Sequence, residues 1–262
     1  MKPLCAAVLT VMCGMTVCAQ SDSDSVMDSN DLYYSVVNYT SSWVEVTYPG
    51  EMPRSMWEGH EMPSGQIIFP ATIMHEGRQF DVREVDEWTF MGCKDITGVE
   101  FTDDLKSIGF SAFAFCEGLT SVRVPHSVTH LGGCSFLGCK NLKEVTLPAG
   151  LKALNPYVFA DCVALRQVEL PETLTMIDRS AFDHSGLESV SIPEKVIFIG
   201  MNAFRDCANL RSIEVKAIRP PALEAGSFAG IGPDAVLYVP QGCADAYRAA
   251  EGWKDFQDIR EQ

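Results

Sequence analysis

Apolar side chains recur at regular intervals through the central part of the chain. The clearest marker is a phenylalanine that returns at equal steps, except that the last step is one residue shorter. A period of about 23 residues is typical of solenoids, in which each repeat forms one coil and buries its apolar side against its neighbours. The sequence therefore predicts about six coils of this length, marked by Phe90, Phe113, Phe136, Phe159, Phe182 and Phe204.

Each predicted coil contains a segment in which apolar and polar residues alternate, as in Val145-Thr146-Leu147. Alternation predicts a β-strand with one inward face, and the proline that follows ends the strand because it lacks a backbone donor. A second apolar pair comes next, followed by a glycine, asparagine or aspartate. Because these residue types tolerate a positive φ, we expect every coil to turn through the left-handed region there. The positions are Asp86, Gly109, Gly132, Asn155, Asp178 and Gly200.

The repeat is flanked by two segments with other patterns. Short strands over residues 32–37, 43–48 and 66–69 predict an N-terminal β cap across residues 32–84. The solenoid covers residues 85–217. Arg219-Pro220-Pro221 is expected to break the repeat, and a strand over 236–239 and a helix over 243–250 predict a C-terminal cap across residues 218–262. The predicted fold class is a repeat solenoid, mostly β with short turns and helical segments and capped at both ends.

The N-terminal segment, residues 1–19, has the pattern of a secretory signal peptide. Lys2 precedes an apolar stretch over residues 3–17, and Ala19 satisfies the small-residue rule for cleavage. Lipidation of Cys18 is the alternative, although the branched Val17 fits that peptidase poorly. Residues 20–31 are acidic and are expected to form a disordered tether. Because no later stretch has the roughly 20 apolar residues of a membrane-spanning helix, we expect a secreted, periplasmic or cell-surface protein without a transmembrane segment.

The formal net charge of −15 argues against nucleic acids as partners, since phosphates would be repelled over most of the surface. The five histidines fall in no zinc-protease or serine-hydrolase motif. The sequence therefore predicts no catalytic residue, no metal site and no cofactor. An enzyme that hides a carboxylate pair among its many acidic residues is a weaker alternative.

Five cysteines occupy one position of the repeat, shortly after the phenylalanine. This common phase points the cysteines inward and predicts that they are buried free thiols. Stacked parallel side chains do not converge as a disulfide requires. The wide spacing of the cysteines along the chain also offers no close pair that could bind zinc. Cys134 and Cys243 fall outside the series, and their state is left open. The series comprises Cys93, Cys116, Cys139, Cys162 and Cys207.

The repeat unit resembles the BspA-like leucine-rich repeat of bacterial surface proteins. The resemblance rests on segments such as Leu142-Lys143-Glu144-Val145-Thr146-Leu147-Pro148, on the apolar pair Leu151 and Leu154 that follows, and on Ala160-Asp161-Cys162. It covers the chain from about residue 67 onward. The resemblance implies a leucine-rich-repeat solenoid, exposure at the cell surface, and adhesion or protein binding, without naming a ligand.

Two sets of residues are candidates for binding. The outward positions of the predicted strands are polar and largely acidic, and they lack the aromatic platform of many sugar binders, so a protein ligand is favoured over a glycan. A carbohydrate-binding accessory protein is the alternative. One coil also departs from the repeat with an exposed apolar spot, for which local packing is the competing interpretation. The candidate residues are Arg123, Glu144, Glu169 and Glu214 on the strands, and Met176, Ile197 and Phe198 at the apolar spot.

Overall fold

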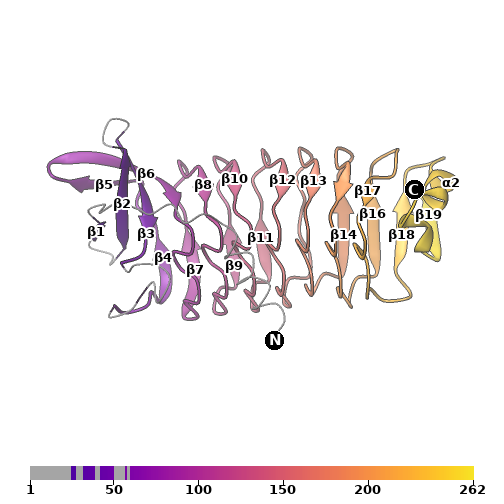
Figure 1. Cartoon of the computed structure of the whole chain (residues 1–262), viewed down its shortest axis with the longest axis horizontal. Helices are drawn as coiled ribbons and strands as arrows, with labels where there is room; N and C mark the ends of the chain where they lie inside the picture. Colours follow the sequence, from indigo (N-terminus) through magenta and orange to yellow (C-terminus); the bar gives the residue numbers. More distant parts are fainter. Residues whose placement is uncertain (1–24, 28–31, 39–41, 50–56, 58–59) are drawn as a thin grey trace.

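The repeats stack as successive coils of an elongated β-solenoid, which confirms the predicted fold class (Figure 1). The structure is a computed structural model, and it describes residues 25–27, 32–38, 42–49, 57 and 60–262. The solenoid has about eight turns, so the six predicted coils are continued at the ends. The predicted signal peptide and the lipidation alternative at Cys18 lie outside the described residues. Within the described part of the chain, no helix is both long and apolar enough to span a membrane.

The coils contribute longer strands to one face, except for the coil of Phe159, and two-residue strands to the other. The first surface is called the long-strand face, and it consists of β7 (Ile96–Glu100), β9 (Ser121–Arg123), β11 (Glu144–Thr146), β14 (Ser189–Ile192), β16 (Ser212–Val215) and β18 (Val236–Val239). The second is called the short-strand face, and it consists of β8 (Ser107–Ile108), β10 (His130–Leu131), β12 (Ala153–Leu154), β13 (Met176–Ile177), β15 (Phe198–Ile199) and β17 (Ala222–Leu223). Every recorded pairing between coils is parallel, as stacking of identical units requires.

The phenylalanines form one stack along the core. The rings of Phe113 and Phe136 lie 5.6 Å apart with 6° between their planes, and both side chains are fully buried. The stack continues beyond the six predicted members to Phe228, whose ring lies 5.0 Å from that of Phe204. Phe228 escaped the sequence analysis because it follows Phe204 at a longer step than any that separates the other phenylalanines.

The turns of the coils differ from the prediction. None of the six expected positions has a positive φ. In each coil the left-handed residues lie two and six positions after the expected one. In the coil of Asn155, for example, they are Tyr157 (φ 59°) and Asp161 (φ 57°). The glycines at the expected positions have another cause, which is close approach: a Cβ on Gly109 would lie 2.6 Å from the backbone nitrogen of Glu87 in the preceding coil. Where the position carries Asn155, its side-chain amide donates to the carbonyl oxygen of Leu131 instead.

The thiols of the repeat form a hydrogen-bonded ladder. Cys139 Sγ donates to the carbonyl oxygen of Phe113, and Cys162 Sγ donates to that of Phe136, each at 3.2 Å. All seven cysteines of the described residues are free and buried, which confirms the prediction for the repeat position. Cys134 and Cys243, whose state the sequence left open, belong to the same free and buried group.

The N-terminal cap is a β-sheet that continues the short-strand face. Its strands are β1 (Ser25–Met27), β2 (Tyr33–Asn38), β3 (Trp43–Thr47), β5 (Thr72–His75) and β6 (Arg78–Val85). The remaining strand of the cap, β4 (Gly65–Ile68), pairs in parallel with β7 and continues the long-strand face. Strands β2, β3 and β4 agree with the sequence-based prediction, whereas the hairpin of β5 and β6, which turns through Glu76 and Gly77, was not predicted. Part of the expected disordered tether forms β1, which pairs with β2. Trp57 closes the core by stacking on Phe90, with ring centroids 6.4 Å apart.

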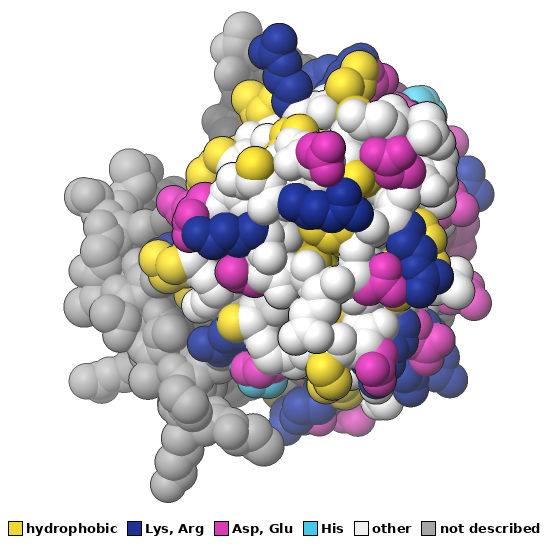
Figure 2. All heavy atoms as spheres, turned by 90° about the vertical axis from the view of Figure 1, so that its right-hand side faces the viewer, with side chains coloured by type: hydrophobic (Ala, Val, Ile, Leu, Met, Phe, Trp, Pro, Cys, Tyr) yellow, Lys and Arg dark blue, Asp and Glu magenta, His cyan; other side chains and the backbone are white. Residues whose placement is uncertain are grey.

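At the other end, the expected break at the two prolines is wrong. Strand β17 begins at Ala222, directly after Pro221, and pairs in parallel with β15, so the stack continues. The cap proper consists of α2 (Ala244–Ala249), the 3-10 helix η1 (Trp253–Asp255) and β19 (Asp258–Glu261), which pairs with β18. Trp253 lies fully buried, and its indole nitrogen donates to Pro221 O at 2.8 Å. Seen from this end, basic and acidic side chains are interspersed and hydrophobic ones occur in small patches (Figure 2).

Candidate functional site

The predicted binding residues of the strands lie on the long-strand face, with their side chains directed outward. Within β9 and β11, Glu144 is the register partner of Ser121, and Thr146 is that of Arg123. The residues between them, such as Val122, are directed into the core. Glu214 lies farther along the same face, between its register partners Ser191 in β14 and Tyr238 in β18. The alternation predicted from the sequence therefore holds on this face, and Tyr238 adds an aromatic ring that the sequence analysis did not include.

A hollow of about 880 Å³ lies over the middle of the long-strand face. The coil of Phe159 forms no strand across residues 166–171, although β11 on one side and β14 on the other are strands, so the sheet is interrupted there. Glu144 and Glu169 both line the hollow, together with Lys143 and Arg166. Lys216 reaches across its edge and pairs with Glu172 at 2.7 Å. The structure thus brings two of the four predicted strand residues into one depression of mixed charge.

The remaining strand residues do not share the hollow. Arg123 is exposed on β9, beside the coil that carries Glu144, and Glu214 accepts hydrogen bonds from Ser191 Oγ and from Gln262 Nε2. Glu214 is therefore held by its neighbours, whereas Arg123 takes part in none of the ion pairs of the described residues.

The predicted apolar spot lies on the short-strand face instead. Met176 in β13 and Phe198 in β15 are register partners, so the residue missing beside Gly186 does not shift the phase of this coil. Both side chains are half-buried, whereas Ile197 is 72% exposed. Ile197 borders a hollow of about 310 Å³ whose opposite wall is Ile218 and the two prolines after it. The apolar patch, defined by Ile197, Phe198 and Ile218, is therefore separate from the strand residues on the other face.

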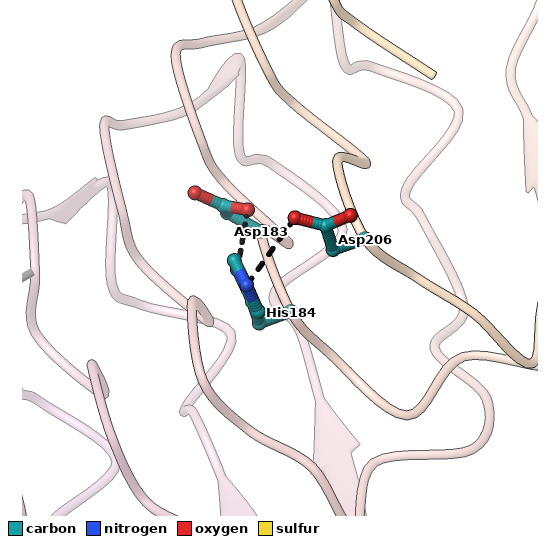
Figure 3. Close-up of side chains that lie close together, drawn as sticks. All are labelled: Asp183, His184 and Asp206. Carbon is teal, nitrogen blue, oxygen red and sulfur yellow. Dashed lines mark hydrogen bonds and ion pairs between the residues drawn. The ribbon is translucent and has the colours of Figure 1, made fainter. Parts of the chain in front are cut away.

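A cluster of ionisable side chains that the sequence analysis missed lies in the same coil as Phe182. His184 points its two ring nitrogens at two carboxylates: Nδ1 lies 2.8 Å from Asp183 Oδ1, and Nε2 lies 3.3 Å from Asp206 Oδ2 (Figure 3). Among the described residues, this is the one group whose ligand-type atoms are close enough together to hold a metal ion. Arg205 already satisfies the buried carboxylate, because its Nε and Nη2 donate to the two oxygens of Asp183 at 3.1 and 3.0 Å.

This cluster is best described as an ion-pair network between two coils. The side chain of Asp183 is only 2% exposed, and a buried carboxylate needs a cation and hydrogen bonds to offset the loss of water. The signal for it was available in the sequence as a departure from the repeat, since the position after the phenylalanine is apolar in the preceding coils. Those residues are Met91, Ala114, Leu137 and Ala160.

Comparisons with known proteins agree with the geometry. Residues 83–211 match the model described as "BspA type Leucine rich repeat region" in six copies. No curated protein matches the chain. A leucine rich cell surface protein from Faecalibacterium prausnitzii has a similar structure, with a TM-score of 0.58 and 25% identity over 79% of this chain and 58% of the other. The chain thus spans less than two thirds of that relative's length.

A leucine rich repeat protein of T. pallidum is also similar, with 23% identity and a TM-score of 0.47 over 87% of this chain and 92% of the other. The family itself rests on the repeat model, which covers about half of the chain and coincides with the stacked coils. The six repeat copies, and the solenoid that they build, show that this chain belongs to the BspA-type leucine-rich repeat family.

Proposed function

We propose that this protein is a non-catalytic binding protein, secreted or held at the cell surface, that binds a protein ligand on its long-strand face. The observation that carries the proposal is the hollow of about 880 Å³ in that face, where the sheet is interrupted and Glu144 and Glu169 lie together. A rigid scaffold that presents a shaped depression of mixed charge suits recognition of a folded protein surface, in which polar contacts determine orientation and partner choice.

Several features favour a protein ligand over a glycan. The outward side chains of β9 and β11 are serine, arginine, glutamate and threonine, with no aromatic ring on which a sugar could stack. Tyr238 is the aromatic residue in register with Glu214, and it lies toward the C-terminal end, outside the residues that line the hollow. Surface location is supported by the signal-like pattern of residues 1–19 and by the name of the Faecalibacterium relative.

The apolar patch supplies a second candidate contact. Exposed isoleucines on an otherwise charged surface favour association when they are covered by a partner. Ile197 is 72% exposed and Ile218 is 65% exposed, and they face the same hollow. We infer that this patch adds to binding on the short-strand face, independently of the long-strand face.

A capture experiment tests the proposal. The full chain is immobilised and exposed to solubilised surface proteins of neighbouring or host cells, and captured proteins are quantified beside a glycan array. The combined change Glu144→Lys and Glu169→Lys should abolish capture, because it reverses charge inside the hollow. The matched control is Asp103→Lys with Asp104→Lys, which makes the same change in net charge at two exposed turn residues. Equal capture by both variants, or binding to glycans alone, would refute the proposal.

A further inference from the structure

A third depression lies where the N-terminal cap meets the first coils, on the short-strand side of the molecule. It has a volume of about 560 Å³, and its lining runs from β3 and β6 to the starts of the next four coils. Aromatic and apolar side chains form its middle, with Phe110 on one side of Gly133 and Pro156 on the other. One end is strongly acidic, and it is formed by Glu45, Glu84, Asp86 and Glu87.

The depression is open because one coil lacks a side chain at its centre. Gly133 occupies a repeat position that carries a side chain in every neighbouring coil, and its φ is not in the left-handed region. A Cβ there would lie 3.2 Å from Pro156 O and 3.4 Å from the Phe110 ring, so the backbone admits a side chain after a small adjustment. The backbone conformation therefore does not require glycine at position 133. The absence of a side chain at Gly133 leaves the groove open. The equivalent residues are Glu87, Phe110, Pro156, Arg179 and Met201.

Two glutamates of the acidic end lie directly opposite each other. Glu45 in β3 and Glu84 in β6 are register partners on adjacent strands, and like charges directly opposite each other destabilise a sheet. In the described part of the chain, no ion pair involves Glu45, Glu84 or Glu87.

The electrostatics of this end favour a bound cation. Burial, and then the charges of Asp86, Glu84 and Glu87, raise the pKa of Glu45 to about 8. Burial and the charge of Asp86 also raise the pKa of Glu84, although His130, which lines the same groove, opposes that shift. A positive charge placed beside Glu45 and Glu84 would relieve the repulsion between them.

The other end of the groove has the opposite character. Arg179 lies over the ring of Tyr157 at 5.6 Å, and both residues line the groove. The groove therefore changes from acidic, through apolar, to cationic along its length. From the coil of Glu87 to that of Pro156 there are three steps of about 4.8 Å, or about 14 Å, which corresponds to about four residues of an extended chain.

We propose that this groove binds a short extended segment of a partner protein, with a lysine or arginine side chain against Glu45 and Glu84 and an apolar side chain packed on Phe110 beside Gly133. Charge complementarity selects this occupant, because the acidic end attracts a basic side chain while the overall charge of −15 repels anionic partners. A metal ion fits less well, since the carboxylates at this end do not form a metal-type group among the described residues.

Fluorescence polarisation with a labelled lysine–leucine peptide tests the proposal on the full chain, at about pH 9 so that Glu45 is ionised in the free protein. The combined change Glu45→Gln and Glu84→Gln should weaken binding by about tenfold or more, the equivalent of one lost charge pair of about 1.4 kcal/mol. The control Asp103→Asn with Asp104→Asn makes the same change in net charge at two exposed turn residues that do not line the groove, and it should change the dissociation constant by less than about twofold. Equal weakening by the two pairs would show general charge attraction and overturn the site.

A second pair of variants tests the groove itself. Gly133→Met places in the groove the side chain that Met201 carries at the same repeat position, and it should weaken binding of the peptide at least as strongly. Ala225→Met makes a similar change at the equivalent exposed position outside the groove, and it should have no effect. Melting temperatures establish that each variant is folded. Unchanged binding by Gly133→Met, or equal binding of a glutamate–leucine peptide, would overturn the proposal, and neither result bears on the long-strand face.

Discussion

The thiol of Cys139 donates a hydrogen bond to the carbonyl oxygen of Phe113, one coil back, at 3.2 Å. The same bond recurs between Cys116 and Phe90 at 3.1 Å and between Cys207 and Phe182 at 3.1 Å. The common phase of the cysteines thus has a structural cause, because the thiols of Cys116, Cys139, Cys162 and Cys207 each donate to a buried backbone carbonyl of the preceding coil.

These thiols should be inert toward alkylating reagents in the folded protein. Burial raises the pKa of Cys139 and of Cys93 to about 12, so the reactive thiolate is negligible at neutral pH. We expect no labelling by a thiol reagent under native conditions and labelling of all repeat cysteines after denaturation, measured by mass spectrometry. Rapid native modification of Cys139 or Cys162 would show that the ladder is absent.

Removing one ring from the aromatic stack should cost several kcal/mol. Phe136 is fully buried between Phe113 and Phe159, at 5.6 and 5.8 Å, so Phe136→Ala leaves a cavity that two neighbouring coils share. The expected loss in free energy of unfolding is about 3–5 kcal/mol, measured by denaturant titration. Thr146→Ala, at an exposed strand position, serves as the control and should change stability by less than about 0.5 kcal/mol.

The ion-pair network predicts an order of stabilities. Arg205→Ala leaves the buried Asp183 carboxylate without its cation and should cost about 2 kcal/mol, less than a fully buried pair because Arg205 is 35% exposed. Adding Asp183→Ala should restore part of the loss, since alanine occupies this position in the coils of Phe113 and Phe159. Thermal unfolding of the three proteins checks the order, and a double variant less stable than Arg205→Ala would contradict it.

Glu45 should destabilise the protein as pH rises. Its folded pKa of about 8 lies above the ordinary value of 4.5, so the folded state retains a proton that the unfolded state releases between these values. Its contribution to stability is therefore fully present below about pH 4.5, declines up to about pH 8 and is then constant. Glu45→Gln should raise the melting temperature relative to the native protein at about pH 8.5 and have little effect at about pH 4.5. An equal effect at both values would show that Glu45 titrates normally.

Substitutions at the adjacent residues Ile197 and Phe198 of the apolar patch should have different effects on stability and on association. Ile197 is 72% exposed, so Ile197→Ser should leave the free energy of unfolding within about 0.5 kcal/mol while it weakens association with a partner or a second copy. Phe198 is half-buried and pairs in register with Met176, so Phe198→Ser should cost about 1–2 kcal/mol in stability. Chemical denaturation and analytical ultracentrifugation separate the two effects. Unchanged association of Ile197→Ser would assign the patch to packing alone.

Much of the fold was predictable because the repeat is a local property of the chain. Each coil repeats the same residue types at the same positions, so the phase of Phe113 or Cys139 predicts which side chains are inward without knowledge of distant contacts. The same reasoning correctly separated outward Glu144 from inward Val122. Prediction from the repeat failed where the repeat length changes, so neither Phe228 nor the pairing of β17 after Pro221 was predicted.

The tertiary structure decided the features that depend on contact between coils. Left-handed positions could not be assigned from residue type alone, because Gly109 is required by the approach of the preceding backbone, whereas Tyr157 is held at a positive φ by the stacked coils. Likewise, Glu144 and Glu169 line one hollow where the segment that carries Glu169 forms no strand, and Glu45 and Glu84 are opposed because β3 of the cap pairs with β6. The sequence determined which side chains face outward, and only packing between coils and cap determined which of them form a site.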